Sequence, residues 1–354
     1  MVTIYDIAKR ANCSAMTVSR VINNTGRISD RTRARVLAIM NEMNYVPNEA
    51  ARSLVRQETK LLSLLITDIT NPFFTSVARG AEDAARQLGY RLLLANSDES
   101  VDKEREYMET ILSMRVDGVL FAPTGDQSAA NLEKLTERNV PIVLLDREVP
   151  DMACDIIQGD SLGGARQLME HLIQLGHRRI AFINGSTVTS TARLRLEGYL
   201  ESLKAHQIEA NEAYIIEADY RQSDIEEQIH HMFGAGADGL ETAVHSSEPP
   251  TAVFAANNFL ALTAIRALRK LSIRVPDDVS VVCFDDLEAS YVVDPFMTVI
   301  AQPAYTFGYQ GIQMLVERIK QGPAQDAADW RRIVLQPELI VRRSAIERAG
   351  GNVV

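Results

Sequence analysis

The sequence predicts two kinds of fold in one chain. An all-α headpiece contains a helix-turn-helix, and an α/β core follows with two lobes, each built on a parallel, doubly wound sheet. Three observations lead to this prediction: residues 3–23 hold two short amphipathic helices, apolar strand-like runs alternate with helices from Leu61 onward, and the net charge changes sign between the parts. Because 354 residues are too many for one compact core, we expect two or three domains.

The first two helices are marked by apolar stripes and by caps. One stripe runs through residues 4–8 and another through 18–22, and Thr3 and Ser14 are suited to cap the two helices. A short polar face remains outward on the second helix, formed by Ala15, Met16, Thr17, Ser19, Arg20 and Asn23. Such a face can reach base edges and phosphates in a major groove. The pair therefore predicts a DNA-binding motif, although any small helical subdomain could show the same spacing.

The charge distribution supports this interpretation. Through residue 60 the chain has ten basic and five acidic residues, a net charge of +5. The whole chain carries −10, so the remainder carries −15. A basic head on an acidic body fits a module that meets phosphate, joined to one that does not.

A third helix and a linker are expected to complete the headpiece. The helix runs from a Ser29 cap to about Asn44, and residues 45–47 break it. Residues 48–60 are short, polar and basic, and could form one marginal helix that is too short to be stable alone. We expect a linker that is ordered against a partner; a plain flexible tether is the alternative.

The core shows two series of buried strands separated by amphipathic helices. In the first, strands are expected at 61–66, 91–95, 118–122 and 141–145, with helices near 74–88, 102–115 and 128–138. In the second, strands are expected near 179–184, 213–216, 252–256 and 279–284, with helices near 162–175, 192–206, 223–233 and 258–271. Two such lobes leave a ligand cleft at the carboxyl ends of their strands.

The last part of the core is expected to cross back between the lobes. It has a strand near 297–301, a helix near 303–320, and two strands near 331–342. The expected domains are a headpiece at 1–46, a hinge at 47–60 and a core at 61–354. Within the core, we expect an N-lobe at about 61–160 and 294–322, and a C-lobe at about 161–293 and 323–342.

Several classes of protein are not supported. There is no signal-peptide pattern and no run of about eighteen apolar residues, and the three cysteines are widely spaced, so we expect a cytoplasmic protein with reduced thiols and no membrane contact. The string GAGADG at 234–239 fits a dinucleotide-binding spacing, but it follows a helix and is interpreted as a surface turn. The histidines lack metal-ligand spacing and no nucleophile or phosphate-binding motif occurs. Neither an enzyme nor a metal or other cofactor is expected.

Seven strings in order make the chain resemble the lac-repressor (LacI/GalR) family of bacterial transcription regulators. They are TIYDIAKRANCSAMTVSRVIN, NYVPNEAARSL, NPFF at 71–74, VDGVLF at 116–121, HLIQLGHRRIAFING at 171–185, RLEGY at 195–199, and VPDDVSVVCFDD at 275–286. The match runs nearly end to end. It implies a periplasmic-binding-protein-like core behind the headpiece.

The resemblance implies which residues meet DNA. In the family the first two positions of the second helix choose bases, and here these are Ala15 and Met16, which can touch a thymine methyl but cannot form a bidentate contact. Arg20 would read a guanine. Supporting and phosphate contacts would come from Thr17, Ser19, Tyr5 and Ser14.

For the linker, the resemblance implies a hinge helix that folds on DNA. Leu54 holds the position of the leucine that wedges into the central base step of the minor groove, and Ala51 lies near it at the partner hinge. Ordinary helix packing is the alternative role for Leu54.

The resemblance also implies a small-molecule site between the lobes. Positions matching the family's pocket are Phe73, Phe74, Arg195, Tyr220, Asn257 and Asp285. Planar Arg, Asn and Asp groups suit the vicinal hydroxyls of a sugar, and aromatic faces cover its C–H surface. Asn258 and Cys283 depart from the residues usual in the family. The resemblance therefore does not decide how the helix near Asn258 is capped or how the strand at Cys283 ends.

We therefore expect a regulator, and more specifically a repressor, that binds a pseudo-palindromic operator as a homodimer and responds allosterically to a small molecule, expected to be a sugar. Two alternatives stay open for the effector: a nucleobase corepressor or a phosphoprotein partner. A ligand-binding α/β protein without a DNA role is the remaining alternative.

Overall fold

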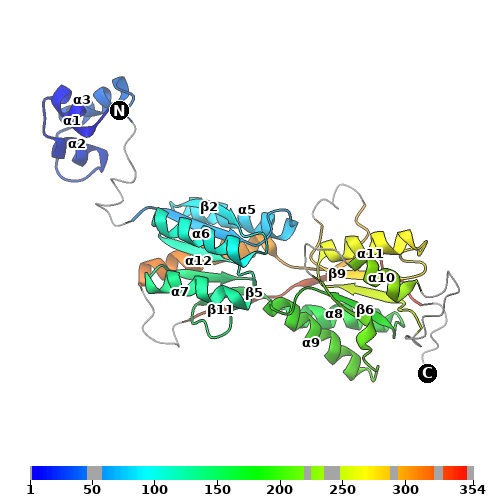
Figure 1. Ribbon diagram of the computed structural model, residues 1–354. Helices are drawn as coiled ribbons and strands as arrows, with labels where there is room; N and C mark the ends of the chain where they lie inside the picture. The colour runs from blue at the N-terminus through cyan, green and yellow to red at the C-terminus, as the bar shows by residue number, and fades with distance from the viewer. Residues whose placement is uncertain are drawn as a thin grey trace. The chain divides into compact units, whose positions relative to one another are not determined.

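The computed structural model describes residues 2–45, 58–218, 225–234, 248–287, 294–322 and 330–348. The chain divides into two compact units, Met1–Thr59 and Lys60–Val354 (Figure 1). Most of the expected hinge, with Ala51 and Leu54, lies outside the described residues, as do Tyr220 and the GAGADG string after Gly234. Within the described ranges, no helix has the length and apolar character needed to cross a membrane.

In its described part, the N-terminal unit consists of the helices α1 (Ile4–Ala11), α2 (Ala15–Ile22) and α3 (Asp30–Glu42). Each begins at a hydroxyl cap, because the side chains of Thr3, Ser14 and Ser29 accept backbone N–H groups of the first turn. The apolar stripes meet in a small core formed by Ile7, Ala8, Ala11, Val18, Val21, Val36 and Met40.

The N-lobe is built on a sheet with the strand order β11-β5-β4-β3-β1-β2, in which every pairing is parallel. Its strands are β1 (Leu61–Ile66), β2 (Arg91–Asn96), β3 (Gly118–Phe121), β4 (Ile142–Leu145), β5 (Asp155–Gly159) and β11 (Arg332–Leu335). The helices of this lobe are α5 (Pro72–Gln87), α6 (Val101–Met114), the short η1 (Asp126–Ser128), α7 (Ala129–Glu137) and α12 (Ala304–Gln321). Two buried clusters lie on opposite faces of the sheet, as expected for strands that are apolar on both sides.

The C-lobe repeats this plan with the strand order β12-β10-β9-β8-β6-β7. Its strands are β6 (Ile180–Asn184), β7 (Ile215–Glu217), β8 (Ala252–Ala255), β9 (Ser280–Phe284), β10 (Thr298–Ala301) and β12 (Glu338–Ile340). Its helices are α8 (Ser161–Gln174), α9 (Ser190–Ala205), the short η2 (Glu212–Tyr214), α10 (Ile225–Phe233) and α11 (Asn258–Lys270). The edge pairing of β10 with β12 is antiparallel, so this sheet is mixed rather than wholly parallel as expected.

The lobe assignment of the final segments differs from the expectation. Strand β10 was expected in the N-lobe but pairs with β9 of the C-lobe, and β11 was expected in the C-lobe but pairs with β5 of the N-lobe. Between them α12 packs on α5, so the orange helix of Figure 1 lies among cyan N-lobe elements. The lobes are therefore joined by crossings before α12 and after β11, as well as by the one after β5.

Close packing of α12 on α5 depends on two glycines. A Cβ on Gly308 would lie 1.9 Å from the carbonyl oxygen of Val77, and one on Gly80 would lie 2.0 Å from that of Tyr305. Because neither position has room for a methyl group, the two helix backbones can approach directly. This contact fixes the position of α12 against α5.

Candidate functional site

The first candidate site is the exposed face of α2 and the start of α1. Met16 is 64% exposed and Tyr5 is 74% exposed, unusually high values for large apolar side chains. Ala15, one position earlier, is half-buried against the core of the unit. The two residues expected to choose bases therefore differ in reach, since Met16 projects and Ala15 does not.

Hydrogen bonds order the polar side chains of this face. The Ser14 hydroxyl accepts the Thr17 N–H at 3.1 Å, so it marks the helix N-terminus, where a phosphate is favoured. Asn23 donates its side-chain amide to the Ser19 hydroxyl at 3.3 Å. The exposed Arg20 side chain lies across Gly26, whose positive φ of 72° suits a glycine. Thus every headpiece residue expected at DNA lies in the described part, on or next to α2 or near the start of α1.

The second candidate site is the cleft between the two lobes of the core. Its walls come from the ends of parallel strands and the starts of the helices that follow, the usual ligand position in such sheets. The residues lining it are Asp68, Asn71, Phe73, Phe74, Glu99, Asp146, Arg147, Thr191, Arg195, Asn257, Phe259 and Asp285. The structure therefore brings together five of the six expected effector residues, and the sixth, Tyr220, lies outside the described residues.

Two buried carboxylates face this cleft from corresponding places in the two lobes. Asp146 follows β4 and Asp285 follows β9, each with a φ of 65° and each buried. Burial raises the pKa of Asp285 to about 6, although the Arg195 charge and a hydrogen bond from Gln302 pull it down. Burial likewise raises the pKa of Asp146, and the charges of Arg147 and Arg195 oppose the shift.

Two buried guanidinium groups balance part of this charge. Arg147 donates two bonds to the Glu99 carboxylate, at 2.7 and 2.8 Å. Arg195 donates to the Ala256 carbonyl at 2.6 Å and lies 4.0 Å above the centre of the Phe284 ring. Each cation is thereby held in one orientation.

Several buried polar atoms of the cleft have no hydrogen-bond partner among the described residues. They include Oδ1 of Asp146 and Nε of Arg195, and also Oε1 of Gln302, whose amide donates to the lining residue Asp285. A buried polar atom without a partner is costly, so native proteins rarely keep one without a reason. Together these atoms offer two acceptors and one donor to a polar ligand.

The apolar wall and the caps are also ordered. Phe73 and Phe74 meet edge to face with their ring centres 5.0 Å apart. Asn257 caps α11 by accepting the Leu260 N–H at 2.8 Å. Asn258, which departs from the family pattern, is buried and donates to Asn71 of the other lobe at 3.4 Å. It therefore contributes to lobe contact, and the cap is intact.

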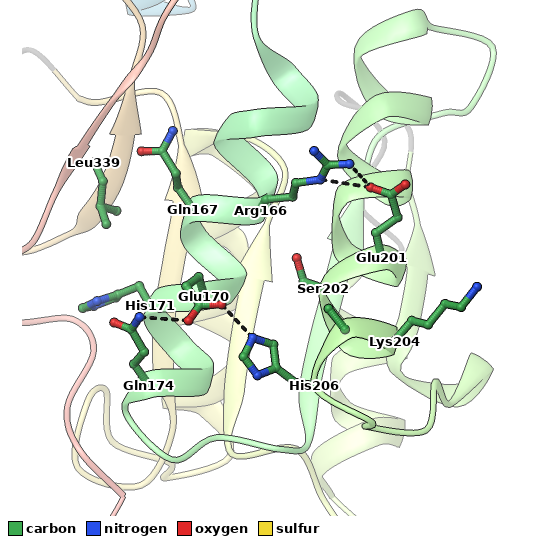
Figure 2. Close-up of a pocket in the computed structure, with 11 residues that line it drawn as sticks. Arg166, Gln167, Glu170, His171, Gln174, Glu201, Ser202, Lys204, His206 and Leu339 are labelled. Atoms are coloured by element: carbon green, nitrogen blue, oxygen red, sulfur yellow. Dashed lines mark hydrogen bonds and ion pairs between the residues drawn. The ribbon is translucent and has the colours of Figure 1, made fainter.

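The cleft is nearly closed in this structure, with a cavity of about 30 Å³. A far larger hollow, of about 970 Å³, lies on the surface between α8 and α9 (Figure 2). There the charged side chains pair with one another, as Arg166 does with Glu201 and His206 with Glu170. One buried atom without a partner among the described residues, Nε2 of His171, lines that hollow, but the cleft has both buried carboxylates and both buried guanidinium groups, so it is the better candidate site.

Sequence reasoning missed more than half of the cleft lining. Asp146 and Arg147 directly follow the apolar run of β4, a position that could have signalled them by the strand-end rule. Asn71 begins the NPFF string and was passed over in favour of its two phenylalanines. Glu99 and Thr191 had no such signal, because only the fold places them at the cleft.

The chain is similar to known proteins over both its N-terminal unit and its core. Residues 3–48 match the family model of bacterial regulatory proteins, lacI family, and residues 169–345 match that of a periplasmic binding protein-like domain. The chain is 35% identical to the HTH-type transcriptional regulator DegA of Bacillus subtilis (strain 168), covering 97% of each chain. It is 34% identical to the ribose operon repressor of Escherichia coli (strain K12), covering 98% of this chain and all of that one. A crystal structure of the lac repressor dimer bound to operator and the anti-inducer ONPF is similar, with a TM-score of 0.80 at 30% identity, covering 98% and 99%.

Proposed function

The chain belongs to the lacI family of bacterial regulatory proteins, and from this premise we propose that it is a repressor controlled by a small neutral sugar bound between the lobes of its core. As a member, it is a DNA-binding transcription regulator with a helix-turn-helix headpiece, and it is not an enzyme. We propose in addition that the protein represses transcription, that its effector is a sugar, and which residues bind that sugar.

The proposal of a sugar effector rests on the set of unpaired polar atoms in the cleft. A sugar hydroxyl both donates and accepts, so neighbouring hydroxyls can satisfy Asp146 and Arg195 together. The Asp285 carboxylate can accept a further hydroxyl proton. Phe73 and Phe74 supply an apolar wall for the C–H surface of the ring. A ligand without hydroxyls would leave these buried groups unpaired and would be rejected.

The charge of the cleft favours a neutral ligand over a phosphorylated one. Four carboxyl groups, on Asp68, Glu99, Asp146 and Asp285, line it with only two guanidinium groups. Burial already disfavours the ionised forms of Asp146 and Asp285, and it raises the pKa of each. A phosphate would add two more negative charges to this site. The similarity to a ribose operon repressor supports an aldose, and D-ribose is the first compound to test.

A homodimer is the proposed functional form. Leu94 on the edge strand β2 is 44% exposed, and Leu262 on α11 is 40% exposed, so each lobe offers an apolar side chain to a partner. We propose the headpiece at 1–46, with Arg20 and Met16 at the bases, and the hinge at 47–60, with Leu54 and Ala51 in the minor groove. A dimer then presents two headpieces to two half-sites.

Thermal unfolding of the full chain tests the effector assignment. D-Ribose, ribose 5-phosphate and hypoxanthine are each added, and ligand at a hundred times its Kd stabilises by about 2.7 kcal/mol. We expect D-ribose or another neutral aldose to raise the Tm, the phosphate to leave it unchanged, and Arg195→Ala to abolish the shift. A rise with hypoxanthine alone would replace the sugar with a nucleobase.

A further inference from the structure

Beyond the effector residues, the two lobes touch at one rim of the cleft through a pair of loops. The N-lobe loop follows β3 and contains Thr124, Gly125 and Asp126, and the C-lobe loop follows β6 and ends at the start of α9. The approach is close, because a Cβ on Gly125 would lie 3.0 Å from the carbonyl oxygen of Val188. The loops are therefore in direct contact.

Asp126 bonds to the C-lobe loop through both its backbone and its side chain. Its N–H donates to the Val188 carbonyl at 3.0 Å. Its carboxylate accepts two bonds from the Arg193 guanidinium, at 2.8 and 3.1 Å. Such bidentate geometry is the strong form of an ion pair, and both side chains are 39% exposed, so water reaches it. A contact of this kind can open and reclose.

Each side of the contact is held in place by its own lobe. In the N-lobe, the fully buried Glu104 accepts bonds from the Thr124 N–H, the Thr124 hydroxyl and the Ser128 hydroxyl, at 2.8–3.0 Å. In the C-lobe, Glu217 accepts the Thr187 N–H at 2.8 Å, and Arg193 donates to the Thr187 carbonyl at 2.9 Å. Two pre-ordered loops meet, so little further order is required to close them.

The same loops reach the cleft residues. Arg147, whose guanidinium is bound by Glu99, also donates to the carbonyls of Pro123 and Thr124 at 3.2 Å each. On the other side, Arg193 stands two residues before Arg195 on α9. A movement of either cleft arginine therefore acts on the loop beside it.

We propose that Asp126 and Arg193 form a latch that holds the two lobes closed over the effector cleft, with Arg147 connecting it to the ligand. A second interlobe bond, from the Glu148 N–H to the Ser190 hydroxyl at 3.0 Å, lies outside the latch and must break when the lobes separate. The latch sets the fraction of closed protein before any effector binds, and hence the rate at which the cleft admits and releases it.

Amide hydrogen exchange at residue resolution on the effector-free full chain tests this. The amides of Asp126 and Glu148 each donate across the lobes, so each reports opening. In Arg193→Ala and Asp126→Asn we expect both amides to exchange about fivefold faster, the size that a solvent-exposed ion pair can supply. Arg166→Ala is the control, since it removes an exposed arginine paired with Glu201 within the C-lobe. It should change neither amide.

Three results at these two amides would overturn the latch. They are unchanged exchange in both variants, faster exchange at Asp126 without any change at Glu148, and equal acceleration in the control. Amides of the buried strand β8 should keep their protection, and their loss would mean that the variants act by general unfolding, which also refutes the latch. Because this experiment contains no effector, failure of every neutral aldose to bind would refute the proposed effector and leave the exchange result standing.

Discussion

The substitution Asp285→Asn should stabilise the effector-free protein while removing its response to effector. Burial raises the pKa of Asp285 from 3.8 to about 6, so the folded protein binds this proton more tightly than the unfolded chain does. Below about pH 4 the carboxyl is protonated in both states and does not destabilise the folded protein. As the pH rises from about 4 through 6, ionisation of the buried carboxyl destabilises the folded protein, by about 1 kcal/mol at pH 4.5 and about 3 kcal/mol at pH 7.5 for a shift of about two units. Asparagine carries no charge, can accept the Gln302 bond and tolerates the φ of 65°.

Urea unfolding of the full chain at the two pH values measures this difference. We expect Asp285→Asn to exceed the wild type by about 2–3 kcal/mol at pH 7.5 and by about 1 kcal/mol or less at pH 4.5. Asp278→Asn is the matched control, because Arg274 lowers the pKa of that exposed carboxyl to about 2, so its loss should bring no gain. No gain at pH 7.5, or a gain independent of pH, would refute the reasoning.

Three further perturbations follow from particular contacts. Asp155→Asn removes the buried partner of Arg318 and Arg331 and should cost about 3–5 kcal/mol in urea unfolding; a loss below 1 kcal/mol would contradict a structural role. Gly308→Ala should cost about 1–3 kcal/mol, because the added methyl meets the backbone of α5, and an unchanged Tm would show that α12 can shift. Arg20→Ala should weaken binding to a selected operator by about tenfold or more and relax preference at one base pair; a uniform loss across all sequences would mean a phosphate contact instead.

The elements that sequence patterns predicted best are those with a local signature. Hydroxyl caps such as Thr3 and Ser14, and continuous apolar runs such as that of β1, locate helices and buried strands from neighbouring residues alone. Strand β5 was missed because its first residue is Asp155, a buried carboxylate made tolerable by Arg318 and Arg331 from distant segments. The prediction also assigned β10 and β11 to the wrong sheets, because the partners of a strand are set by long-range packing.

In the candidate sites, too, sequence patterns located some residues, and others were placed only by long-range packing. The resemblance to the family pointed to Arg195, Asn257 and Asp285, and the structure places all three at the cleft. Glu99 and Arg147 reach it only because the ends of parallel strands meet, 48 residues apart in the chain. The latch pair of Asp126 and Arg193 is likewise invisible in the sequence, because two exposed charges gain a role only when the lobes are in place.

The central claim is that a ligand between the lobes controls DNA affinity, and one titration tests it most directly. An operator is selected from random duplexes with the full chain, and its Kd is measured by fluorescence anisotropy with and without a saturating neutral aldose that raises the Tm. We predict a change in Kd of at least about fivefold for the wild type and none for Arg195→Ala. An unchanged Kd in the wild type, with the sugar demonstrably bound, would contradict the account.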